Sequence, residues 1–96
     1  MFEWINKQGV KSSDGFVLES AHRYYYHYSE GNLRMQINVE PRTLPGGRYH
    51  ETIRLDSLRR WLPPHGTQAI SPEEFERIRQ NISSALTFMG IEHDFE

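Results

Sequence analysis

The sequence predicts an α+β fold, an antiparallel β-sheet of about five to six strands with one long C-terminal α-helix packed on one face. Three observations predict this architecture: alternating apolar and polar residues before residue 56, a capped amphipathic segment near the C-terminus, and the order of the two. The 96 residues contain no internal repeat and no long linker. We therefore expect a single domain, residues 1–96.

The helix is predicted over residues 72–89. Ser71 and Glu74 have the spacing of a capping box, and Pro72 suits the first helical position. Gly90 lies where a left-handed residue usually ends a helix. The apolar residues recur at helical spacing and form one narrow stripe for burial, namely Phe75, Ile78, Ile82, Ala85, Leu86 and Met89.

Strands are predicted on both sides of this helix. Residues 16–18 begin a strand after a turn, and residues 22–28 are rich in aromatic residues that favour strands. Residues 33–40 alternate cleanly, and Pro41 is expected to end that strand. Further strands are expected over residues 48–55 and 91–95. Residues 56–62 fit either a strand continued through a bulge or a short helical turn capped by Asp56.

One helix can cover only one face of such a sheet, so the other face is expected to be open. The face toward the helix is predicted to carry the apolar set Tyr24, Tyr26, Tyr28, Leu33, Met35, Ile37 and Val39. The opposite face is predicted to carry Arg23, Tyr25, His27, Arg34, Gln36, Asn38 and Glu40, with His50, Thr52 and Arg54 from the next strand. Glu51 has the parity of the apolar face and is expected at an edge or beside a bulge.

Composition limits the function classes. The net charge of −2 is no basic footprint for nucleic acid, although Arg residues beside strand aromatics resemble a stacking platform. The chain has no cysteine, its start lacks the pattern of a signal peptide, and no apolar run approaches the roughly 20 residues of a membrane span. We therefore expect a cytoplasmic location and no membrane partner.

No catalytic or metal-binding motif stands out. His22, His27, His50, His65 and His93 show no spacing typical of metal ligands, and surface or structural histidines are the simpler interpretation. The sequence lacks a Gly-x-Ser-x-Gly elbow, and Gly46–Gly47 lacks the Lys and helix of a phosphate loop. The sequence predicts no enzyme activity, no metal and no cofactor.

Three segments carry a family resemblance: residues 53–61, the Pro63–Pro64–His65 segment, and a capped helix that begins at residues 70–74 and ends Ala85-Leu86-x-x-Met89-Gly90. They resemble a family of small bacterial immunity proteins encoded beside polymorphic or contact-dependent growth inhibition toxins. Val39–Glu40 fits the same pattern, and the resemblance covers about residues 33–92. It implies a protein that binds a cognate toxin domain and neutralises it in the producing cell.

The resemblance assigns no contact residue. The open face is the candidate for partner binding, with Tyr25, His27, Arg34, Gln36, Asn38 and Arg54 as site residues, because Tyr and Arg are enriched among binding hot spots. The alternatives are a merely solvated face, or an accessory module that homodimerises or binds nucleic acid there. A toxin active on nucleic acid would favour an acidic patch, for which Glu92, Asp94, Glu96, Asp14, Glu19 and Glu30 are available.

Overall fold

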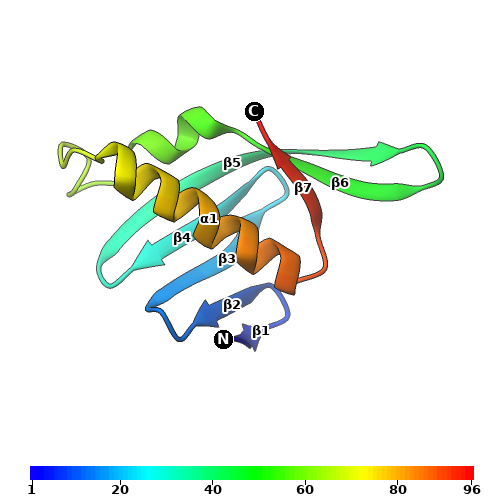
Figure 1. Cartoon of the computed structure of the whole chain (residues 1–96), viewed down its shortest axis with the longest axis horizontal. Coiled ribbons are helices and arrows are strands. Elements are labelled where there is room, and N and C mark those ends of the chain that lie inside the picture. Colours follow the sequence, from blue (N-terminus) through cyan, green and yellow to red (C-terminus); the bar gives the residue numbers. More distant parts are fainter.

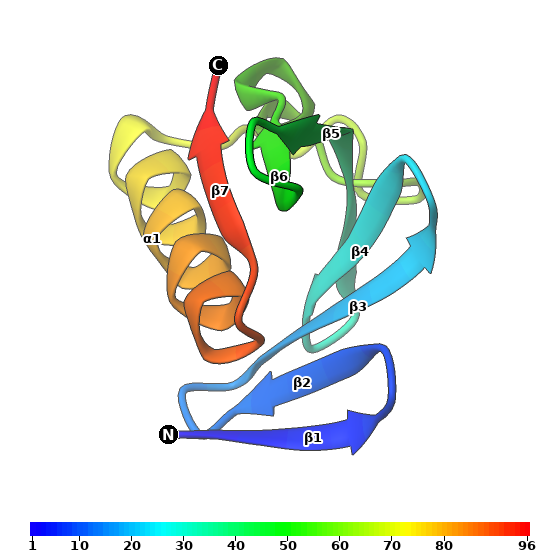
Figure 2. The same cartoon turned by 90° about the vertical axis from the view of Figure 1, so that its right-hand side faces the viewer.

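The computed structural model describes all 96 residues and has an α+β fold with seven strands, a 3₁₀ helix and one α-helix. The elements are β1 Phe2–Asn6, β2 Gly9–Ser12, β3 Phe16–His22, β4 Tyr25–Glu30, β5 Leu33–Leu44, β6 Arg48–Ile53, η1 Leu55–Arg59, α1 Pro72–Phe88 and β7 Glu92–Phe95. The strands follow one another across a single curled sheet in sequence order, and α1 crosses one side of it (Figures 1 and 2). The fold class is confirmed, but the expected five to six strands are seven, because β1 and β2 form an additional hairpin.

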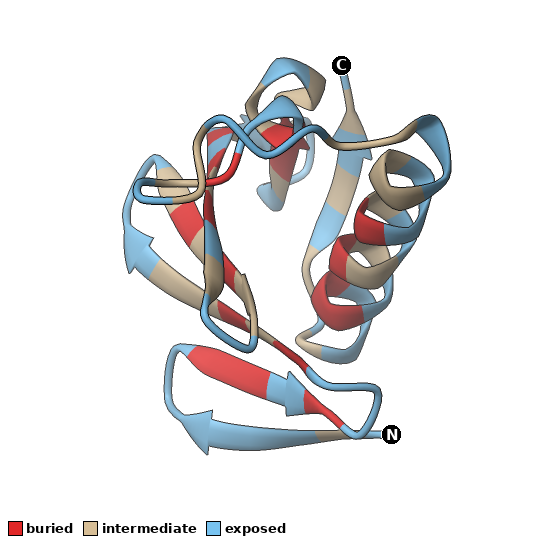
Figure 3. Cartoon of the chain, turned by 90° about the vertical axis from the view of Figure 1, so that its left-hand side faces the viewer, coloured by how far each residue is buried: buried red, intermediate tan, exposed pale blue.

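Helix α1 has the ends that the sequence predicts. The Ser71 side chain accepts from the backbone N–H of Glu74, and the Glu74 carboxylate accepts from the N–H of Ser71. At the other end, Gly90 has a φ of 79°, which favours glycine, and the N–H of Ile91 donates to the carbonyl of Leu86. Ile78, Ile82, Ala85 and Leu86 are buried, on the side that Figure 3 shows turned toward the sheet.

Strand β5 continues through Pro41, so the prediction that this proline ends the strand is wrong. The first half of β5 pairs with β4 and the second half pairs with β6. The N–H of Arg54 donates to the carbonyl of Asn38, and bonding positions alternate along an antiparallel pair. The nitrogen of Pro41 therefore points away from β6, on the side where β4 has already ended, and the missing N–H removes no ladder bond.

The aromatic run 22–28 is split by a turn rather than forming one strand. β3 ends at His22 and β4 begins at Tyr25, so Arg23 and Tyr24 lie in the turn between them. Tyr24 is 52% exposed and does not face the helix as predicted. A two-residue turn within this run reverses the chain direction between β3 and β4. The aromatic composition of the run gave no indication of this turn.

The C-terminal strand and residues 56–62 resolve two further expectations. β7 is present but pairs parallel with β6, so the sheet is not purely antiparallel. Residues 55–59 form the helical turn η1, and its N-cap residue is Arg54 with no side-chain cap, so Asp56 is not the cap. After η1 the N–H of Leu62 donates to the carbonyl of Arg34 at 2.6 Å, which places this segment against the free edge of β5.

One hydrophobic core fills the space between the sheet and α1. Its largest side chains include Trp61 and Tyr28, whose rings stack with centroids 6.4 Å apart. From the inner face of β4 and β5 it contains Tyr26, Tyr28, Met35, Ile37 and Val39, as the alternation predicts. Leu33 is half-buried and packs against the core. The inner face is therefore devoted to folding.

Glu51 lies in this inner face without an edge position or a bulge, contrary to expectation. It pairs with Pro41 on one side and His93 on the other, and it is 5% exposed. The hydroxyls of Tyr26 and Tyr49 both donate to its carboxylate. Burial, followed by these contacts with Glu51, raises the pKa of both tyrosines, that of Tyr49 to about 12. Two hydroxyl donors thus make a buried carboxylate tolerable.

No helix of the structure is long and apolar enough to cross a lipid bilayer.

Candidate partner-binding face

Five of the six predicted site residues lie together on the side of β4 and β5 that faces away from α1. We call this the outer face: Tyr25, His27, Arg34, Gln36 and Asn38. Tyr25 is the antiparallel partner of Asn38, and His27 is the partner of Gln36. Arg34 and Asn38 are exposed, and the other three are half-buried. In Figure 2, α1 lies on the inner side of β3, β4 and β5, so α1 does not cover the outer face.

The outer-face side chains hold one another in place. The rings of His22 and Tyr25 stack with centroids 5.0 Å apart and planes 10° from parallel. The Tyr25 and His27 rings follow at 5.6 Å. On β5 the Gln36 amide donates to the side-chain oxygen of Asn38 at 3.1 Å. The face is therefore partly ordered before any partner arrives, which lowers the entropy lost on binding.

His27 is held in one neutral form by Arg34. The guanidinium Nη2 lies 3.0 Å from His27 Nδ1, and since arginine can only donate, Nδ1 accepts and the ring proton sits on Nε2. Burial and the positive charge of Arg34 both lower the pKa of His27, and Glu19 opposes them. At neutral pH the ring thus presents an N–H donor to a partner.

A polar hollow adjoins the outer face, between β5 and the segment that follows β6. Its volume is about 1030 Å³. It is lined by Gln36, Asn38, Asp56, Ser57, Arg59, Arg60, Trp61, Leu62, Pro63, Gly66 and Thr67. Two hydrogen bonds fix its wall against β5: the N–H of Leu62 donates to the carbonyl of Arg34, and the N–H of Asn38 donates to Ser57 Oγ. Sequence reasoning missed this hollow, because it depends on how residues 56–67 fold back.

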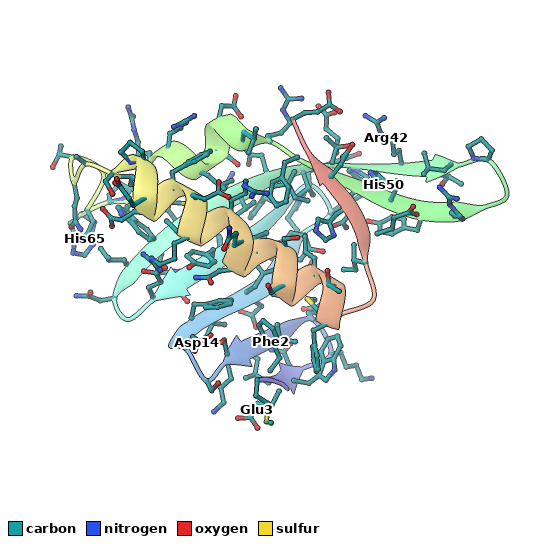
Figure 4. All side chains as sticks on the ribbon, in the orientation of Figure 1. Phe2, Glu3, Asp14, Arg42, His50 and His65 are labelled. Carbon is teal, nitrogen blue, oxygen red and sulfur yellow. The ribbon has the colours of Figure 1, made fainter.

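The sixth predicted residue, Arg54, follows β6 and lies opposite Asn38, at the border of the outer face. Its N–H reaches Asn38, but its guanidinium lies 3.6 Å from the Glu40 carboxylate. Thr52 and His50 are not open to a partner as expected: Thr52 is fully buried, and His50 lies 3.1 Å from Asp94. Figure 4 shows His50 beside Arg42 on the β5–β6 arm, far from His65 at the opposite end. On β6, therefore, burial of Thr52 and the contact of His50 with Asp94 take these side chains out of the open face.

One pair of side chains is hydrogen-bonded in the way that a catalytic nucleophile is bonded to its general base. Sequence reasoning did not find this pair. Ser83 on α1 lies 2.9 Å from Nε2 of His93 on β7, and Nδ1 of His93 lies 2.9 Å from the carbonyl of Ile91. The carbonyl requires a proton on Nδ1, so Ser83 donates to Nε2. Neither residue lines a hollow, and the contact joins β7 to α1. No group of three or more His, Asp or Glu side chains is arranged to hold a metal ion.

A second exposed surface lies at the β1 edge. Four of the six exposed large apolar residues gather there, namely Met1, Trp4, Ile5 and Phe88. The Phe88 ring lies 5.9 Å from that of Trp4 and 5.4 Å from that of Phe2, which Figure 4 places near the end of α1. Sequence reasoning missed this apolar edge, because β1 and β2 were not predicted as a hairpin.

Comparison with known proteins yields no match to a family model, to a curated protein or to a solved structure. The resemblance to bacterial immunity proteins therefore stays a prediction from the sequence, and the outer face with its polar hollow is the site on which a function can be argued.

Proposed function

We propose that this chain is an immunity protein, which binds a cognate bacterial toxin domain in the cytoplasm of the producing cell and thereby neutralises it. The observation that carries the proposal is the outer face, where accessible Tyr, Arg, His and amide side chains adjoin a polar hollow. The sequence resemblance over residues 33–92 supplies the kind of partner.

The size of the molecule is compatible with this role. A standard protein–protein interface buries about 800 Å² on each partner. The chain exposes 5981 Å² in total, so such an interface occupies roughly an eighth of its surface. The outer face and the hollow are contiguous through Gln36 and Asn38, which belong to both. Together they form one continuous area for a partner.

The chemistry of the face suits a tight contact. Tyr25 offers a large ring that is already stacked, and Arg34 offers a guanidinium that no carboxylate of the chain neutralises. Tyr and Arg are the residues that most often dominate binding energy, and rigid side chains lose little freedom when bound. A pre-formed face serves either route of neutralisation, occupation of the toxin's active site or binding at an exosite.

The test is the double substitution Tyr25→Ala/Arg34→Ala, measured by calorimetric titration with the toxic domain encoded by the neighbouring reading frame. We expect affinity to fall at least about 100-fold, since two hot-spot side chains are lost. A matched control is Arg23→Ala/Tyr24→Ala, the same two residue types in the exposed β3–β4 turn, where Arg23 lies over the Tyr24 ring. Unchanged affinity of the first variant would make the site wrong, and absence of binding by the wild type would make the function wrong.

A second candidate function is nucleic-acid binding, or homodimerisation, through the same face. The stacked His22 and Tyr25 rings beside Arg34 are the observation that favours it, because bases stack on such rings. A gel-shift assay at low salt separates the two functions. Binding to generic DNA or RNA that weakens steeply with salt would favour this candidate over the immunity protein.

A further inference from the structure

Most acidic side chains are already bonded within the chain, whereas several basic side chains have no carboxylate partner. Most of these unpaired basic side chains lie at the polar hollow or on the adjoining outer face. Nine of the thirteen acidic side chains already accept a bond within the chain: Glu3, Glu19, Glu30, Glu40, Glu51, Glu74, Glu76, Glu92 and Asp94. Six of the eleven basic side chains are in ion pairs with carboxylates: Lys11, Arg42, Arg48, Arg54, Arg77 and Arg79. The net charge of −2 therefore does not describe what a partner meets.

Five basic side chains lack a carboxylate partner; two of them line the polar hollow, and a third lies on the adjoining outer face. Arg59 and Arg60 line it, whereas Arg34 lies on the outer face two residues before Gln36, with its guanidinium 3.0 Å from His27 Nδ1. The guanidinium of Arg59 stacks 3.9 Å from the Phe75 ring centroid, which fixes its position without neutralising it. The other two, Lys7 and Arg23, lie in the turns β1–β2 and β3–β4. Asp56 is the one carboxylate in the lining.

The neutral groups of the hollow and of the adjoining outer face are also oriented as donors. The side-chain oxygen of Asn38 accepts from Gln36, which leaves the Asn38 NH₂ group free to donate. Nδ1 of His27 accepts from Arg34, which leaves its Nε2–H free to donate. A carboxylate is an acceptor only, and an arginine fork matches its two oxygens. Charge and hydrogen-bonding capacity thus both favour an anionic carboxylate.

We propose that the polar hollow and the adjoining outer face receive a carboxylate-bearing loop of the toxin, with Arg60 in the hollow and Arg34 on the outer face as its main partners. This inference rests on the proposed function and names the chemistry of the partner. It places the charged contact away from the expected acidic patch, because four of the six residues of that patch, all except Asp14 and Glu96, are engaged within the chain: Glu92, Asp94, Glu19 and Glu30 contact Arg48, His50, Asn6 and Arg77. A protein loop fits better than a nucleic acid, which needs a track of several phosphate contacts rather than one hollow.

The first experiment needs no toxin. A hexaglutamate peptide is titrated into the labelled full chain, and amide shifts are followed by NMR, with a twelve-residue oligothymidylate as the competing probe. We expect the peptide to shift the amides of Gln36, Asn38, Ser57 and Thr67, and the Arg34→Glu/Arg60→Glu variant to lose at least tenfold in peptide affinity. Lys7→Glu, a charge reversal in the distant turn, should leave it unchanged. Arg34→Gln/Arg60→Gln serves if the reversed variant fails to fold.

Absence of shifts at the hollow, or tighter binding of the oligothymidylate, overturns the inference. The second experiment repeats the calorimetric titration with the toxin domain. If wild-type binding is tight and Arg34→Glu/Arg60→Glu binds equally tightly, the acidic loop is wrong while the immunity function stands. If the toxin domain does not bind the wild type, the proposed function fails, and the peptide titration still decides whether the hollow selects carboxylates.

Discussion

The two faces of β4 and β5 are built from alternate residues of the same strands, yet they serve different ends. On the inner side Tyr26, Tyr28, Met35 and Ile37 are at most 4% exposed and pack under α1. On the outer side their neighbours Tyr25, His27, Gln36 and Asn38 are half-buried or exposed and bond mainly to one another. Folding thus constrains one residue in two, and the alternate residues are left available for binding.

The largest expected difference between the two faces is in the free energy of unfolding, when each of two adjacent residues of β5 is replaced by alanine. Ile37→Ala removes a fully buried side chain, and we expect it to lower the free energy of unfolding by about 2–5 kcal/mol. Gln36→Ala, one position earlier on the outer face, should change it by less than about 0.5 kcal/mol. Urea denaturation of both variants checks this. Equal losses would mean that the outer face is part of the fold's support.

A smaller effect is expected from the paired tyrosines. Tyr26→Phe removes one of the two hydroxyls that donate to the buried Glu51 carboxylate, and should destabilise the chain by about 1–3 kcal/mol. Tyr25→Phe removes a hydroxyl from the outer face and should have little effect on stability, which makes it the matched control. Thermal unfolding of the two variants at equal pH measures the difference, and indistinguishable midpoints would contradict the role given to Glu51.

The smallest effect concerns pH. Because burial and Arg34 lower the pKa of His27 in the folded chain, the unfolded chain takes up a proton first as the pH falls below about 6.5. The stability that the neutral ring contributes is therefore present above that pH and lost on acidification. His27→Gln should lose less stability between pH 7 and pH 5 than the wild type, by under about 1 kcal/mol since solvent screens the pair. Parallel curves for the two proteins would contradict this.

Local signals predicted the parts of the fold that local chemistry determines. The helix α1, its capping box and its glycine end follow from side chains near in sequence, and the alternation over 33–40 assigned both faces of β5. The expectation for Pro41 failed because strand pairing changes from β4 to β6 at that point. The prediction that Glu51 lies at an edge or beside a bulge was wrong for a related reason: its hydroxyl donors are Tyr49 on β6 and Tyr26, which is distant in the sequence.

The candidate site was predictable only in part. Five of its residues follow from strand parity, because parity alone decides which side of a sheet a side chain takes. The polar hollow depends on residues 55–67 folding against the edge of β5, a long-range contact without a local signal. The same holds for Arg54, whose ion pair with Glu40 arises from the pairing of β5 with β6.

The most direct test of the central claim is an NMR map of the chain with and without the toxin domain, recorded on backbone amides and methyl groups. The account predicts that the largest changes fall on Tyr25, His27, Arg34, Gln36 and Asn38 and on residues 56–67 around the hollow. Changes confined instead to Trp4, Ile5 and Phe88 at the apolar β1 edge would contradict it, because the partner would then bind through a surface that shares no residue with the outer face.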